Sequence, residues 1–273
     1  MRKRTGSIIC PNCERLVGAS EPKCPFCGAV QPGLFGFGPA IQRTLRRIDL
    51  AMIVMVVCGA FYVIALLLAP SAIFRMRGIF DILSPAGGAL DVLGMTGAHA
   101  FAQGRWWTVF TAIFLHGSVL HILFNMVILR QYLPNVSELY GPVRAWVIFL
   151  VSGAVGFVVS NLATGAPTIG ASGSIFGMLA ALIVYGRRSG QHTVTRQLWM
   201  SAGVMFLYGF LMPSVNNWAH AGGFASGFVA AEAMAFANRR ESPVVIALAA
   251  VLTLVTVGGF AMEGLRFLRM MGQ

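Results

Sequence analysis

The sequence is poor in charged residues. They make up 11% of its 273 residues, and only nine of them are acidic, whereas about a quarter of an ordinary soluble domain is charged. Hydrophobic residues make up 57%, and the mean hydropathy is +0.75. A water-soluble fold has too little interior to bury so many apolar side chains, so the composition excludes one. It indicates a protein that crosses a membrane several times.

Three common signals are missing. No HExxH sequence occurs, which excludes a zinc protease of that type, and no GxSxG sequence occurs, which excludes the nucleophile elbow of α/β-hydrolases. No apolar stretch precedes Ala40, so a cleavable signal peptide is not expected. The first membrane helix would then direct insertion.

Only five cysteines occur, and four of them lie near the N-terminus as two CxxC pairs ten residues apart: Cys10, Cys13, Cys24 and Cys27. Two such turns point four thiolates at one tetrahedral ion, which predicts a structural zinc ribbon. Disulfides are the alternative, and a redox CxxC pair would need a larger βαβ unit than this segment can hold. Because zinc thiolates require a reducing compartment, the N-terminus should be cytosolic. The fifth cysteine, Cys58, is expected to pack as a small hydrophobe.

Seven apolar segments are expected to be membrane helices, near 48–69, 118–133, 143–163, 171–186, 197–213, 217–237 and 243–262. The predicted domains are the ribbon at 1–30, a basic Gly/Pro-rich linker at 31–47, a six-helix core at 48–237, and an additional helix with a tail at 238–273. The predicted fold class is an all-α membrane protein, a six-helix bundle plus one C-terminal helix.

The excess of basic residues predicts the orientation. Twenty basic and nine acidic residues give a net charge of +11, and arginines occur in alternate loops. The loops near 163–170 and 213–216 carry none, whereas those containing Arg130, Arg144 and Arg187 do. Cytosolic loops are enriched in Lys and Arg, so the N-terminus is expected in the cytosol. The same rule accounts for the charge without nucleic-acid binding, which is not expected.

Polar residues inside a membrane are costly, so each needs an explanation. His121 and Asn125 lie four residues apart, on one face of the second predicted helix. Ser172 begins the fourth helix, and His220 lies near the start of the sixth. These three helices would cross the membrane in the same direction. All four side chains are therefore expected near its outer face.

Two glycine patterns would let the fourth and sixth helices approach closely. They are Gly173xxxGly177 and Gly223xxxGly227, and each begins just after a polar residue described above. Small residues spaced in this way allow helix backbones to come nearly into contact. Packing on these faces would bring the serine and the histidine within hydrogen-bonding reach.

Ser172 and His220 form a predicted catalytic dyad. A serine hydroxyl becomes an effective nucleophile when a base removes its proton, and His220 would be that base. Glu232 is expected to be the only acidic residue well inside a membrane helix. It lies about 18 Å beyond His220 along the helix, too far to orient the imidazole. His121, Asn125 and the backbone N–H of Ser172 would stabilise the oxyanion. Taken singly, these residues would suit a helix cap, a buried histidine and interhelical contacts, but their shared depth favours catalysis.

In this order the motifs resemble those of the rhomboid family of intramembrane serine proteases. HxxxN is present at 121–125, GxSG at 170–173 and AHxxG at 219–223. The resemblance implies a rhomboid-like bundle, with Ser172 as the nucleophile and His220 as the base. It implies substrates that span the membrane once, cleaved near the outer end of their helix, lipid around the bundle, and no cofactor for catalysis. The fifth helix and the loop 211–218 would act as gate and cap.

Some questions stay open on the sequence alone. An inactive rhomboid-like protein that binds membrane helices is the alternative, although the intact dyad favours an enzyme. A transporter is disfavoured because the polar residues gather at one face rather than at the midplane. The ribbon leaves room for a cytosolic protein partner.

Four residues near the motifs carry further expectations. Thr108 stands where many rhomboid proteins have arginine after a tryptophan, and whether the nearby Arg105 substitutes for that arginine in anchoring the first loop stays open. His116 is a candidate supporting residue near the oxyanion face, although a histidine near a membrane surface is often only interfacial. Ser174 is expected to face away from His220 and to serve packing.

Overall fold

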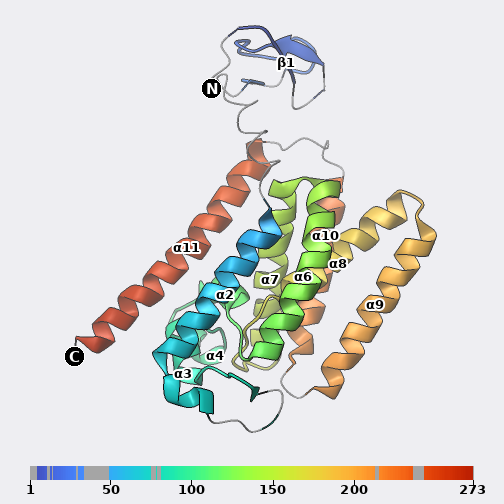
Figure 1. The fold of residues 1–273 in the computed structure, drawn as a ribbon. Helices are drawn as coiled ribbons and strands as arrows, with labels where there is room; N and C mark the ends of the chain where they lie inside the picture. Colours follow the sequence, from blue (N-terminus) through green and yellow to red (C-terminus); the bar gives the residue numbers. More distant parts are fainter. Residues whose placement is uncertain are drawn as a thin grey trace.

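The computed structural model describes residues 5–10, 13, 15–28, 30–33, 49–74, 78, 81–212, 215–235 and 243–272. Most of the predicted linker lies outside these residues, as do 213–214 of the predicted cap. So do several basic residues, at 2–4, 43, 46, 47, 239 and 240, on which the predicted orientation partly rests. In the described part, a small two-stranded segment precedes an all-helical bundle (Figure 1). This confirms the predicted fold class.

A helix forms at each of the seven predicted membrane segments. Shorter helices fill the long loop between the first two, residues 69–118, which we call the first loop. The elements are β1 (Ser7–Ile9), β2 (Leu16–Gly18), α2 (Leu50–Leu68), η2 (Pro70–Phe74), α3 (Gly87–Val92), α4 (Ala98–Ala102), α5 (Thr108–Thr111), η4 (Ala112–Phe114), α6 (Val119–Tyr140), α7 (Pro142–Ala163), α8 (Ser172–Arg188), α9 (His192–Leu211), α10 (Asn217–Ala235) and α11 (Pro243–Met271).

Three helices in the described part of the chain are by themselves long and apolar enough to cross a membrane: α2, α7 and α11. A fourth span results if Thr108–Phe114 and α6, which meet at a bend of 91°, are counted together. α8 has 17 residues and is mostly buried, and α10 is rich in Gly and Ala, which lets it pack closely against α7 and α8. The chain is an integral, multi-pass membrane protein.

α8 lies at the centre of the bundle, packed against α6, α7 and α10, with α9 and α11 at the periphery (Figure 1). The predicted glycine faces bring the backbones of α8 and α10 together. A Cβ added to Gly223 would overlap the carbonyl of Gly173, and one added to Gly227 would overlap Gly177. α7 approaches α10 about as closely, since a Cβ added to Gly156 would lie 2.5 Å from the carbonyl oxygen of Ala219.

The seventh helix is longer than predicted. It continues past residue 262 to Met271 and so contains Glu263, which is 2% exposed. The prediction that Glu232 is the only acidic residue well inside a membrane helix is therefore wrong. Glu263 is paired there with Arg105 of the first loop.

Arg144 also differs from its expected place in a cytosolic loop. It lies in the first turn of α7 and is 1% exposed, and its Nη1 donates to the carbonyl oxygen of Tyr140 at 3.1 Å. The loop between α6 and α7 is shorter than predicted because α6 continues through Pro134 and meets α7 at Gly141. The arginine therefore caps the end of α6 rather than lying in solvent.

Candidate functional site

Ser172 and His220 meet at the starts of α8 and α10. The Oγ of Ser172 and the Nε2 of His220 are 2.9 Å apart, which is hydrogen-bonding distance. The imidazole stacks on the ring of Phe176, with centroids 4.4 Å apart and planes inclined by 26°. Phe176 lies one turn after Ser172 on α8. The helix that carries the serine thus also orients the histidine.

Among the described residues, no carboxylate orients the imidazole. The Nδ1 of His220 is buried and has no hydrogen-bond partner among the described residues. Glu232 is paired with Arg187 and Arg188 instead, toward the other end of α8 and α10. The rings of Phe206 from α9 and His220 form a T-shaped pair, with centroids 6.4 Å apart and planes inclined by 81°. Aromatic contacts on two sides hold the ring where an acid holds it in a triad.

Asn216 fixes the start of the helix that carries His220. Its side-chain Oδ1 accepts from the backbone N–H groups of Trp218 and Ala219 at 3.1 and 3.3 Å, as an N-cap does. Its Nδ2 donates to the hydroxyls of Ser160 and Thr168, at 2.6 and 3.1 Å. This cap ties the first turn of α10 to α7 and to the segment before Ser172.

Neither Asn216 nor Phe176 is among the site residues predicted from the sequence. Asn216 could have been found as an N-cap residue just before a helix. Phe176 could have been found as an aromatic residue four positions after the candidate serine.

His121 projects from the first turn of α6 toward the segment before Ser172. Its Nδ1 accepts from the backbone N–H of Gly117 at 3.3 Å, so in the neutral ring the proton lies on Nε2. A Cβ on Gly170 would lie only 2.6 Å from that Nε2. Gly170 also has a φ of +116°, in the region that favours glycine. The donor of His121 thus faces the turn that leads into α8.

Asn125 lies one turn further along α6 and is 6% exposed. Its Nδ2 donates to the carbonyl oxygen of His121 at 2.8 Å, which uses one of its two N–H groups. The backbone N–H of Ser172 is the first of α8 and has no acceptor within its own helix. The N–H of Ser172 and the Nε2 of His121 are therefore both donors at the turn at 170–172.

His116 and Ser174 lie close to this site in different roles. His116 is fully buried, with its ring centroid 5.0 Å from that of His121, and neither of its nitrogens has a partner among the described residues. Ser174 donates from Oγ to the carbonyl oxygen of Phe149 at 2.7 Å and is fully buried. Ser174 therefore joins α8 to α7, as expected of a packing residue.

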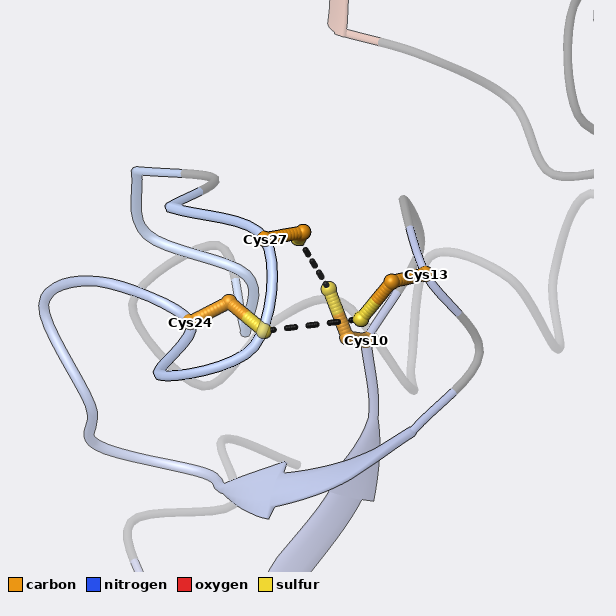
Figure 2. Close-up of side chains that lie close together, drawn as sticks. All are labelled: Cys10, Cys13, Cys24 and Cys27. Atoms are coloured by element: carbon orange, nitrogen blue, oxygen red, sulfur yellow. Dashed lines mark hydrogen bonds between the residues drawn. The ribbon is translucent and has the colours of Figure 1, made fainter.

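The four N-terminal cysteines form a separate cluster (Figure 2). The β1–β2 hairpin, with Ile8 opposite Val17, positions the first pair, and the backbone N–H of Cys10 donates to the Arg15 carbonyl at 2.8 Å. The second pair closes against it: Cys10 and Cys27 have sulfurs 3.8 Å apart, and Cys13 and Cys24 have sulfurs 3.6 Å apart.

The sulfur positions fit one tetrahedral metal ion. All four lie within 4.8 Å of one another. Four sulfurs each bound about 2.3 Å from a tetrahedral ion would lie about 3.8 Å apart. The cluster can therefore hold a metal ion.

Comparison with known proteins supports one family. Residues 103–236 match the family described as Rhomboid domain. Rhomboid protease GluP of Bacillus subtilis (strain 168) is 32% identical over 202 residues, 68% of this chain and 38% of that protein. RHOMBOID-like protein 1 of Arabidopsis thaliana is 33% identical over 151 residues, 52% of this chain and 36% of that protein. Inactive rhomboid protein 1 of Danio rerio is 32% identical over 131 residues, 45% of this chain and 15% of that protein.

The chain thus spans less than half the length of these curated relatives. The matched region contains the polar residues of α6, α8 and α10 described above. On these matches and on its helical membrane fold, the chain belongs to the rhomboid family.

Proposed function

We propose that this protein is an intramembrane serine endopeptidase that cleaves transmembrane proteins by means of Ser172 and His220. The observation that carries the proposal is the 2.9 Å approach of Ser172 Oγ to His220 Nε2. Nε2 takes the hydroxyl proton while Oγ attacks the substrate carbonyl carbon. The imidazolium then gives that proton to the leaving amine, and water releases the acyl group by the same steps in reverse.

The oxyanion formed in each step would be held by His121, Asn125 and the backbone N–H of Ser172. Donors placed in advance where negative charge develops are worth roughly 100- to 1,000-fold in rate each. The positive end of the α8 dipole contributes in the same direction. Gly170 makes this arrangement possible, because any side chain there would collide with the His121 ring.

The proposed orientation places the active site toward the outer face of the membrane. Arg187 and Arg188 end α8 at the end opposite Ser172, and arginines mark the cytosolic side. The N-terminal ribbon would then be cytosolic. Substrates would be proteins with a single membrane helix that enter from the lipid past α9, whose Phe206 contacts His220. Residues 211–218 would cap the site.

Cleavage of a protein with one membrane helix, by the purified full chain in liposomes, tests this proposal. We expect two fragments, cut near the outer end of the substrate helix. The similarity to Inactive rhomboid protein 1 favours one alternative, a protein that binds membrane helices without cutting them. Co-purification of substrate without fragments would support that alternative and contradict the protease.

We also propose that the ribbon at 1–30 holds a structural zinc ion, and that a linker at 31–47 joins it to a protease core at 48–237 and an additional helix at 238–273. Four thiolates in a tetrahedral arrangement suit zinc, and iron is the other metal that takes this set. The zinc would stabilise a hairpin whose buried core, outside the cysteines, is only Ile8, Val17 and Ala19 among the described residues. A ribbon of this kind leaves a surface for a cytosolic protein partner.

Exchanging single cysteines for serine should remove the metal. Metal analysis of the purified full chain is expected to find one zinc per chain, and Cys10→Ser or Cys24→Ser should lower that value to near zero, because three thiolates bind far more weakly than four. Cys58→Ser is the matched control, since Cys58 is buried in α2 and should leave zinc unchanged. Unchanged zinc in both ribbon variants, or iron in place of zinc, would contradict the assignment.

A further inference from the structure

The C-terminal half of α11 is joined to the first loop by a buried cluster of charges. Arg105 of the loop is 3% exposed and Glu263 of α11 is 2% exposed. The Nε and Nη2 of Arg105 donate to the two carboxylate oxygens of Glu263, at 3.0 and 2.8 Å. Nη1 donates to Asp91 Oδ1 at 2.9 Å and to Gln103 Oε1 at 3.2 Å, and Nη2 also donates to the Asp91 carbonyl at 2.7 Å. Every N–H group of the guanidinium therefore has an acceptor.

The rest of the cluster balances these charges. Arg266, one turn after Glu263, donates to Glu263 Oε2 at 3.3 Å and to Asp91 Oδ2 at 3.0 Å. Burial alone would raise the pKa of Asp91, but hydrogen bonds from Arg105 and Arg266 outweigh it, so the pKa lies below its ordinary value. Trp107 adds a hydrogen bond from Nε1 to Glu263 Oε1 at 2.9 Å. Two cations and two anions thus bind one face of α11 to the first loop.

The first loop is in turn bonded to the segment that leads to Ser172. Thr108 donates from Oγ1 to the Arg105 carbonyl at 2.7 Å and lies 3.2 Å from the hydroxyl of Thr96. The Thr96 carbonyl accepts from the backbone N–H of Thr168 at 2.9 Å, as part of an antiparallel bridge. Ala98 likewise bonds through its N–H to the Gly165 carbonyl at 2.9 Å. Thr168 lies just before the turn at 170–172.

We propose that α11 positions the active site, through the contact of Glu263 with Arg105 and the chain of bonds from the first loop to residues 165–170. This proposal rests on the proposed protease function. It gives the seventh helix a role. It also explains why the first loop can be anchored although position 108 holds threonine rather than arginine. The anchoring arginine lies three residues earlier, and its carboxylate partner comes from a helix outside the six-helix core. Glu263 is a positioning residue, since it does not touch the dyad.

Glu263→Gln tests the proposal in the full chain in lipid nanodiscs. It removes the charge and leaves a buried guanidinium without its bidentate partner, which destabilises the first loop. Hydrogen–deuterium exchange should rise by about tenfold or more in residues 87–111 and 165–170, and stay unchanged in α8 and α10. The kcat for cleavage should fall by about tenfold or more with little change in KM, because small displacements of the reacting groups slow chemistry.

Two further variants separate positioning from general stability. Glu232→Gln is the matched control, because it removes a carboxylate paired with two arginines elsewhere and should leave exchange in 87–111 unchanged. The double variant Arg105→Met with Glu263→Met removes the two most deeply buried charges and leaves Asp91 paired with Arg266. It should recover the melting temperature while exchange in 165–170 stays high and kcat stays low.

Three results would overturn the proposal: no rise in exchange in 87–111 with Glu263→Gln, a rise there without one in 165–170, or recovery of kcat in the double variant. Absence of cleavage by the wild-type chain would contradict the protease function instead. The exchange measurements would still decide whether α11 holds the first loop.

Discussion

Replacement of Ser172 by alanine is expected to lower the rate of substrate cleavage by at least about 1,000-fold. The variant loses the attacking oxygen and keeps the oxyanion donors, which by themselves retain only a small part of the catalysis. His220→Ala should have an effect of similar size, and the double variant should be little worse than either single one, because the two residues act as a unit. The measurement is the initial rate of fragment formation in liposomes.

Ser174→Ala is the matched control for this prediction. It removes a hydroxyl from the same helix, two residues along, and that hydroxyl bonds only to Phe149 of α7 among the described contacts. Its cost should be about 1 kcal/mol of stability, with cleavage close to that of the wild type. Cleavage retained in Ser172→Ala, or lost equally in Ser174→Ala, would show that the nucleophile is wrongly assigned.

Gly223→Val is expected to abolish cleavage and to lower the melting temperature, although no catalytic atom is removed. A Cβ at this position would overlap the carbonyl group of Gly173, which is backbone and cannot rotate away. The two helices must then move apart, and overpacking of this kind costs about 1–3 kcal/mol or more. An increase of about 1 Å in the distance between Ser172 and His220 is enough to lower the rate about 100-fold. Gly223→Ala should give the same effects in a milder form.

Thermal unfolding and cleavage rates measured together test this prediction. Gly59→Val in α2 is the control, because a Cβ there would meet nothing within 4 Å. It should leave both values near those of the wild type. If Gly223→Val behaved like Gly59→Val, the close packing of α8 and α10 would not be what brings the serine and the histidine together.

Much of the arrangement within helices could be read from the sequence. The spacing of His121 and Asn125 puts them on one face of a helix, because the helical period is a property of the backbone. The two glycine patterns predicted which faces of α8 and α10 would meet. Composition predicted a multi-pass membrane protein, and the CxxC spacing predicted a cluster of four cysteines that can hold a metal ion. Each of these inferences rests on the geometry of neighbouring residues or on the composition of the whole chain.

Contacts between distant elements could not be predicted in this way. Arg105 and Glu263 are 158 residues apart, and only the packing of α11 against the first loop brings them together. Asn216 likewise contacts Ser160 and Thr168 only because the start of α10 packs against α7 and the segment before α8. The burial of Glu263 could not be predicted either, because a single sequence shows the cost of burying a charge but not the partner that offsets that cost.

The sequence by itself determined that this protein crosses the membrane several times, which residues carry its candidate chemistry, and which helix faces can approach closely. Only the tertiary structure decided how the histidine is oriented without an acid, and how the seventh helix is joined to the first loop. The physical reason is that helical periodicity and hydropathy depend on neighbouring residues. Aromatic stacking and buried ion pairs depend instead on the simultaneous placement of segments far apart in the chain.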